Sequence, residues 1–191
     1  MKIEQTPPEK RIMGIDPGSN CMGYAIIRTT GKSNKPELIV SGVVVMKKLE
    51  DPYLKLKRVF QRTLQVIDTY HPDELAIESQ FYGKNIQSML KLGRAQGVAI
   101  AAALQRDLAI FEYAPRKVKM SITGTGSASK EQIAVLLGKF MTLPATLSTL
   151  DETDAIAIAF CHHLQGEIVP TGDAKCKNWA DFVRHHPDKL V

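Results

Sequence analysis

The amino-acid sequence predicts an α/β fold: a five-stranded mixed sheet with helices on both faces. Five short stretches rich in Val, Ile and Tyr, bounded by Gly, Pro or polar residues, have the composition of strands. The first three follow one another closely, which favours an antiparallel meander. The other two are separated by stretches of helical periodicity, as in units whose strands pair in parallel. A meander joined to such units gives a mixed sheet that helices cover on both sides.

The meander occupies the first quarter of the chain. We expect its strands at residues 11–16, 21–29 and 37–46. Pro and Gly at 17–18 indicate the first turn, and the Gly- and Pro-containing segment 31–36 indicates the second.

The first helix is predicted over residues 51–70. Asp51-Pro52 is a suitable start, because Asp caps helices and Pro tolerates the first helical position, and His71-Pro72 ends the helix. The apolar residues that recur with helical spacing are Leu56, Val59, Phe60, Leu64 and Ile67.

The rest of the chain alternates strands and helices. We expect strands at 74–79 and 109–114 and helices at 85–106, 115–123, 130–140 and 151–164. This order is the ribonuclease-H-like arrangement. We expect a flexible leader at 1–10, one ribonuclease-H-like domain at 11–165 and a C-terminal tail at 166–191.

The composition is that of a soluble globular protein, with 44% hydrophobic and 24% charged residues among 191. No stretch of 18 apolar residues indicates a membrane span, and the polar start lacks a signal-peptide core. Cys21, Cys161 and Cys176 lie far apart, which fits the reducing cytoplasm better than a disulfide scaffold. The net charge of +5 favours a nucleic-acid partner only weakly.

Acidic residues stand at three places where the predicted elements begin or end. Asp16 ends the first strand, Glu78 ends the fourth, and Asp151 and Asp154 open the last helix. The last two are three residues apart and share one helical face, whereas Glu152 points elsewhere. If the first and fourth strands are neighbours and the last helix packs across them, the four carboxylates converge.

Converging carboxylates repel one another and raise their own pKa values unless cations bind them. Oxygen-only ligands suit two Mg²⁺ ions, with Mn²⁺ as a substitute, and two such metals assist phosphodiester cleavage.

Each acid also has a simpler interpretation. Asp16 suits the Pro-Gly turn, Glu78 a solvated strand end, and Asp151 and Asp154 the cap of a helix. The presence of acids at all three places favours the metal site over these separate roles.

Two aromatic residues, Phe81 and Tyr82, follow Glu78 in the polar loop QFYGKN. Aromatic rings exposed beside a metal site stack on unpaired bases; the alternative is that one of them fills the core.

Basic residues surround the Gly/Ser-rich segment 124–129: Arg116, Lys117, Lys119 and Lys130. They suit contacts with DNA phosphates, although such a run is also typical of a solvated face.

The long helix carries Gly93 and Gly97, whose default role is close packing on the sheet and whose alternative is contact with a partner helix. His162 and His163 near the end of the last helix are expected at the surface.

Four segments, in order, resemble the bacterial RuvC-type Holliday-junction resolvases: GIDPGSNCMGYAIIR, LAIESQFYGKNIQSMLKLGRAQGVAIAAAL, FEYAPRKVKMSITGTGSASKEQI and DETDAIAIAFCHH. The resemblance covers residues 11–165. It implies that Asp16, Glu78, Asp151 and Asp154 are the catalytic, metal-binding acids.

The same resemblance assigns contacts with DNA. It implies that Phe81 stacks on bases at the junction centre, with Lys84 in the same loop. Lys119 and Lys130 match basic residues used against the backbone near the cut.

The resemblance further implies a homodimer, joined through the long helix, that acts on a four-way DNA junction. Its two active sites make symmetrical nicks, with a preference for T-rich sites, and leave 5′-phosphate and 3′-hydroxyl ends. The branch-migration proteins RuvA and RuvB are the implied partners.

Three other functions remain to be weighed. A sugar-kinase or actin-like ATPase shares a similar first hairpin, but needs a duplicated domain that 191 residues do not hold. A smaller RNase-H-like nuclease acting on ribosomal RNA precursors shares the opening motif but lacks this D-x-x-D helix. A non-catalytic junction-binding module would not need all four acids.

Overall fold

A computed structural model describes residues 9–30, 33–80, 85–144, 147 and 149–166. They form a single five-stranded sheet in the order β3-β2-β1-β4-β5. Its strands are β1 (Lys10–Asp16), β2 (Cys21–Thr30), β3 (Ser33–Val45), β4 (Glu74–Glu78) and β5 (Ala109–Tyr113). The first three pair antiparallel, whereas β1, β4 and β5 run parallel. The predicted mixed sheet is confirmed, and so is the contact between the first and fourth strands.

The third strand is longer than the sequence predicts. β3 begins at Ser33, so most of the expected turn over 31–36 belongs to the strand. A proline within a strand argues against pairing, but β3 is an edge strand and its pairing with β2 shifts between Arg28 and Thr30. An edge position with irregular pairing accommodates the missing N–H of Pro36.

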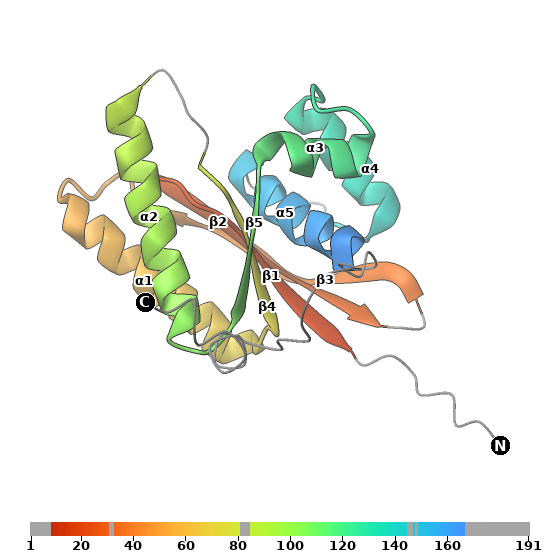
Figure 1. Cartoon of the computed structure of the whole chain (residues 1–191), viewed down its shortest axis with the longest axis horizontal. Helices are drawn as coiled ribbons and strands as arrows, with labels where there is room; N and C mark the ends of the chain where they lie inside the picture. The colour runs from red at the N-terminus through yellow and green to blue at the C-terminus, as the bar shows by residue number, and fades with distance from the viewer. Residues whose placement is uncertain (1–8, 31–32, 81–84, 145–146, 148, 167–191) are drawn as a thin grey trace, which may run out of the picture.

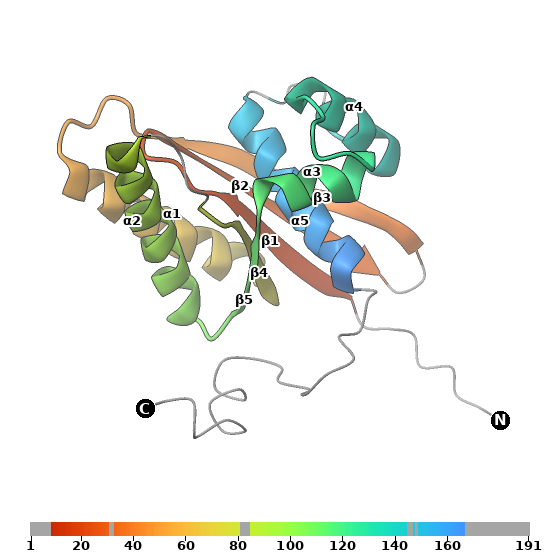
Figure 2. The same ribbon diagram turned by 45° about the horizontal axis from the view of Figure 1, so that its top comes forward.

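Helices cover both faces of the sheet, as predicted (Figures 1 and 2). One face carries α1 (Pro52–Tyr70) and α2 (Ile86–Leu104); the other carries α3 (Pro115–Thr123), α4 (Lys130–Phe140) and α5 (Leu150–Gly166). Among the residues that the structure describes, no helix is both long and apolar enough to cross a bilayer.

The ends of α1 follow the sequence signals. The Asp51 side chain accepts hydrogen bonds from the backbone N–H groups of Tyr53 (2.7 Å) and Leu54 (3.3 Å). His71 ends the helix in a left-handed conformation with φ of 47°. Both predicted boundaries are therefore confirmed to within one residue.

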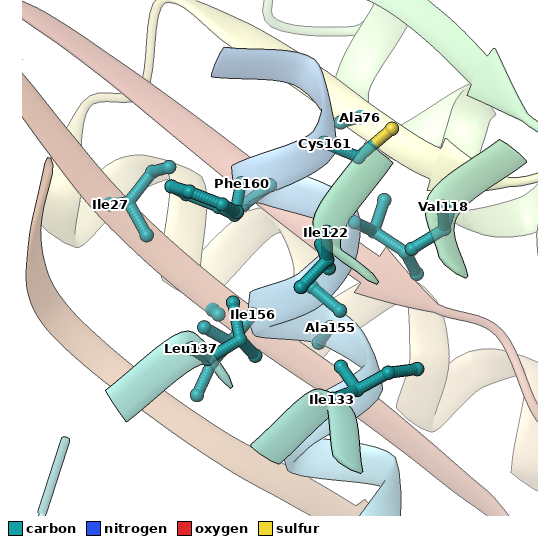
Figure 3. Close-up of a cluster of buried hydrophobic side chains, with 14 of the residues drawn as sticks. Ile27, Ala76, Val118, Ile122, Ile133, Leu137, Ala155, Ile156, Phe160 and Cys161 are labelled. Atoms are coloured by element: carbon teal, nitrogen blue, oxygen red, sulfur yellow. The ribbon is translucent and has the colours of Figure 1, made fainter. Parts of the chain in front are cut away.

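The most buried helix is α5, which lies across β1 and β2 beneath α3 and α4. Its side chains Ile156 and Phe160 meet Leu137 of α4 and Ile122 of α3 in an apolar cluster (Figure 3). Two layers of apolar contact hold α5 in place, one toward the sheet and one toward the outer helices.

The surface role predicted for His162 is wrong. Its side chain is only 4% exposed, and Nδ1 shares a 2.6 Å hydrogen bond with the hydroxyl of Tyr113. The other ring nitrogen contacts the Glu74 carboxylate. The last turns of α5 lie over β4 and β5, so those strands supply polar partners to a histidine that local sequence would place in water.

The default packing predicted for Gly93 and Gly97 is also wrong. A Cβ added to either glycine would meet nothing within 4 Å, and both are exposed. The small residues of α2 that are buried are Ala95, Ala99, Ala102 and Ala103. The two glycines therefore lie on the outer face of the helix.

Candidate metal centre

Three carboxylates gather where β1 ends and α5 begins. One oxygen from each of Asp16, Asp151 and Asp154 lies within 4.8 Å of the others. Asp16 is the last residue of β1, and the other two belong to the first turn and a half of α5. Asp16 is distant in sequence from Asp151 and Asp154, and the three meet at one point because α5 crosses the end of β1.

Gly23 makes this approach possible. It pairs with Asp16 in the β1–β2 ladder, and a Cβ built on it would lie 1.9 Å from the carbonyl oxygen of Asp151. No side chain fits in that space, so only glycine lets the first turn of α5 come down onto the end of β1.

Glu78 ends β4, the parallel neighbour of β1. Its charge acts on Asp16, and the charge of Asp154 acts on it in turn. Glu78 lies outside the group of three mutually close carboxylates among the described residues, and forms one side of the site.

Burial and mutual repulsion change the acidity of these groups. Burial, followed by the charges of Glu78, Asp154 and Asp151, raises the pKa of Asp16 to about 8. Burial, followed by the charge of Asp154, raises the pKa of Glu78 to about 7. Asp16 and Glu78 therefore tend to hold protons until cations offset the negative charge around them.

Lys130 supplies one positive charge from within the protein. Its ammonium group pairs with the Asp154 carboxylate, and its charge lowers the pKa of Asp16. The sequence assigned Lys130 to the DNA backbone, and the structure places its ammonium group on an acid of the cluster.

The other predicted basic contacts lie nearby. The Lys119 ammonium group donates to the carbonyl of Ala128 (3.0 Å), and its charge lowers the pKa of Glu78. Arg116 is exposed and its stem packs on Gly126, where an added Cβ would lie 2.6 Å from the arginine Cγ. Phe81, Tyr82 and Lys84 lie outside the described residues.

Two further polar residues, Glu152 and Gln96, lie near these acids and form hydrogen bonds with residues of the sheet. Glu152 is buried and accepts a 2.6 Å hydrogen bond from Ser41 of β3, so it points away from the other acids, as expected from its helical position. Gln96 of α2 donates to the backbone carbonyl of Glu78 (3.2 Å). The only sequence signal for Gln96 is a polar residue on the alanine-rich, buried face of its helix.

The donor set fits hard divalent cations. Every candidate ligand is a carboxylate oxygen, which suits Mg²⁺, Mn²⁺ or Ca²⁺ rather than a thiolate- or imidazole-binding metal. A divalent cation would also relieve the repulsion that raises the pKa values of Asp16 and Glu78.

Comparison with known proteins gives consistent matches over nearly the whole chain. The sequence model of the family described as crossover junction endodeoxyribonuclease RuvC matches residues 12–162. The crossover junction endodeoxyribonuclease RuvC of Porphyromonas gingivalis is 49% identical, over 97% of this chain and 99% of that protein. The protein of the same name from Bacteroides fragilis is 48% identical, over 97% and 98%.

A solved structure agrees with these matches. It is that of Thermus thermophilus RuvC in complex with a Holliday junction substrate, with a TM-score of 0.77 and 28% sequence identity. The match covers 83% of this chain and 96% of that one.

Proposed function

The chain belongs to the crossover junction endodeoxyribonuclease RuvC family, and we propose that it resolves four-way DNA junctions by metal-dependent hydrolysis of phosphodiester bonds. The observation that carries the proposal is the convergence of carboxylates from β1 and α5 beside the end of β4. Such a cluster has little structural use, because burying like charges costs folding energy.

We assign the metal ligands to Asp16, Glu78, Asp151 and Asp154, with two Mg²⁺ per active site and Mn²⁺ as a substitute. Metal ions held by these carboxylates would supply activation of the attacking water and stabilisation of the leaving oxygen. Asp16 and the α5 acids hold their carboxylates at fixed positions, since β1 and α5 are packed rigidly together.

The basic residues near the site are assigned to the DNA backbone. Lys119 and Arg116 come from α3, and Lys130 from the start of α4, so their charges lie on the same side of the sheet as α5. In the complex with DNA, Lys130 would exchange its contact with Asp154 for a phosphate once metal ions neutralise the acids. Phe81, Tyr82 and Lys84 are assigned to the junction centre on their sequence alone.

The active form is proposed to be a homodimer joined through α2. Exposed small and apolar residues recur on one face of this helix at intervals of three or four: Ile86, Leu90, Gly93, Gly97, Ala101 and Leu104. Ile86 is 70% exposed and Leu90 53%, which is costly for a helix face in water and typical of a protein contact. A second copy would set two active sites against two strands of one junction and explain paired nicks.

We also propose that the protein acts in the bacterial cytoplasm, with RuvA and RuvB as its partners in recombination and repair. We assign the catalytic residues to a nuclease domain at 11–165, with the segments 1–10 and 166–191 before and after it in the sequence.

The test is a cleavage assay on synthetic four-way junctions and matched linear duplexes, with and without Mg²⁺. We expect paired symmetrical nicks in junctions alone, and no cleavage by Asp16→Asn, which should still bind the junction. Equal cleavage of linear DNA would point to a general nuclease, and cleavage of structured RNA alone to an RNA-processing one. Junction binding without cleavage by the native chain would indicate a non-catalytic module.

A further inference from the structure

Gln96 lies on α2 and points at the strand end that carries Glu78. Its side chain is largely buried, with 9% exposed, between the helix and the sheet. Its amide nitrogen makes two hydrogen bonds, one to the backbone carbonyl of Glu78 (3.2 Å) and one to the Glu112 carboxylate (2.8 Å). Gln96 thus joins three elements of the fold: α2, β4 and β5.

Both neighbours of this nitrogen are acceptors. A backbone carbonyl and a carboxylate each require a donor, so the amide must present its NH₂ group and both of its N–H bonds are used. The bond to Glu112 involves a charged acceptor, which makes it the stronger of the two and fixes the amide plane.

The sheet itself cannot satisfy the Glu78 carbonyl. Strands β1 and β4 are parallel, with Ile15 opposite Ile77. The backbone N–H of Ser79 bonds to β5, so the carbonyl of Glu78 faces β1. If the pairing of β1 with β4 continued by one residue, the donor to the Glu78 carbonyl would be the backbone N–H of residue 17. That residue is Pro17, which has no N–H.

We propose that Gln96 is a positioning residue for the metal site: it supplies the hydrogen bond that Pro17 cannot, and so fixes the end of β4 and the Glu78 carboxylate. This inference rests on the proposed function. The same contact ties the site to α2, the helix of the proposed dimer contact. A metal ligand at a strand end needs such support, because loss of a hydrogen bond behind a ligand weakens metal binding or activity by about 10- to 100-fold.

The experiment compares four variants of the full chain with the native protein. Gln96→Leu removes both hydrogen bonds. Glu112→Gln keeps them, since the new amide oxygen still accepts from Gln96. The double variant Gln96→Leu with Gly97→Ala regains helix stability without adding charge, because a Cβ at position 97 enters open space, but it leaves the Glu78 carbonyl without a donor. Gln105→Leu is the matched control, an exposed glutamine at the end of the same helix.

Four quantities are measured for each variant. They are the Mn²⁺ affinity by calorimetry without DNA, the Mg²⁺ concentration for half-maximal nicking, the melting temperature without metal, and junction affinity in EDTA. Gln96→Leu should lower the Mn²⁺ affinity and raise the required Mg²⁺ by about tenfold or more. Junction affinity should stay unchanged, and Glu112→Gln and Gln105→Leu should resemble the native protein.

The double variant separates positioning from simple stability. We expect its melting temperature to return toward that of the native protein, while its Mn²⁺ affinity stays as low as that of Gln96→Leu. Metal affinity that follows the melting temperature across the series would overturn the inference, and so would native Mn²⁺ affinity in Gln96→Leu. A native protein that binds Mn²⁺ but cuts no junction would overturn the proposed function instead, without affecting the Mn²⁺ result.

Discussion

Two pairs of glycines in this protein lie in opposite surroundings. A Cβ added to Gly14 or Gly23 would lie 2.1 Å and 1.9 Å, respectively, from backbone oxygens of α5. A Cβ added to Gly93 or Gly97, on the outer face of α2, would meet nothing within 4 Å. The first pair is required by packing inside the chain, whereas no contact inside the chain accounts for the second.

The difference separates the two parts of the proposed mechanism. Beneath α5, tight packing fixes the acids that would bind metal. On α2, small and apolar residues remain exposed, and the open space beside Gly93 and Gly97 would let a second copy approach closely. The role of a glycine in this protein therefore depends on what lies opposite it, and the number of glycines in a segment does not reveal that role.

Among the variants that test this difference between the two glycine pairs, Gly23→Ala should have the largest effect. The added Cβ must displace the first turn of α5, so we expect a loss of about 1–3 kcal/mol in the free energy of unfolding. Nicking should fall by about 100-fold or more, because displaced ligands no longer match the metal site. Chemical denaturation and single-turnover cleavage measure the two effects.

Gly97→Ala is the matched control for that variant. Its Cβ enters open space, and alanine is the better helix former by about 1 kcal/mol, so monomer stability should be equal or higher. A Gly23→Ala protein as stable and active as Gly97→Ala would contradict the assigned difference between the two glycine pairs.

Gly97→Arg tests the open surface. Arginine fits the monomer but introduces a bulky charge into the proposed contact between two α2 helices, so the dissociation constant of the dimer should rise by about tenfold or more. Sedimentation measures the association, and paired nicking should turn into single nicks while the melting temperature of the monomer is kept. An unchanged monomer–dimer balance would remove α2 from the interface.

The acids beneath α5 predict a dependence of stability on pH in metal-free protein. The pKa of Asp16 is raised from 3.8 to about 8 and that of Glu78 from 4.5 to about 7. Between these limits the unfolded chain has lost protons that the folded one retains, so the contribution of these two acids to stability is largest below about pH 4 and falls steadily as pH rises to about 7 to 8.

Thermal melts in EDTA from pH 5 to 8.5 measure this slope. Asp16→Asn should have a smaller slope and melt about 2–10 °C above the native protein at pH 8. Saturating Mn²⁺ should flatten the native profile. A native melting temperature that rises over this range in EDTA would contradict the raised pKa values.

Lys130→Met should have the smallest effects of these variants. It should strengthen the binding of metal and weaken the contact with DNA. Without the ammonium group on Asp154, Mn²⁺ affinity should rise by about two- to fivefold, since the pair is partly exposed and screened. The dependence of junction affinity on salt should weaken by about one unit of slope. Lys139→Met, at an exposed lysine of the same helix, should change neither quantity.

Much of the fold was available from local patterns. The periodicity of 51–70, the Asp51 cap and the strand compositions each depend on residues close in sequence, and the structure agrees with them. The exception is β3, whose start at Ser33 depends on pairing with β2 along an edge that tolerates Pro36. Strand length is set by the partner strand as well as by the segment itself.

The sequence by itself determined which carboxylates stand at the ends of β1 and β4 and on one face of α5, because strand ends and helical spacing are local properties. Only the tertiary structure decided which residues from distant segments contact one another and which remain exposed. It placed Lys130 on Asp154, buried His162 against Tyr113, turned Gly93 and Gly97 outward, and set Gln96 behind Glu78. These are contacts between distant segments, and they follow from how α2 and α5 pack on the two faces of one sheet, which no local pattern specifies.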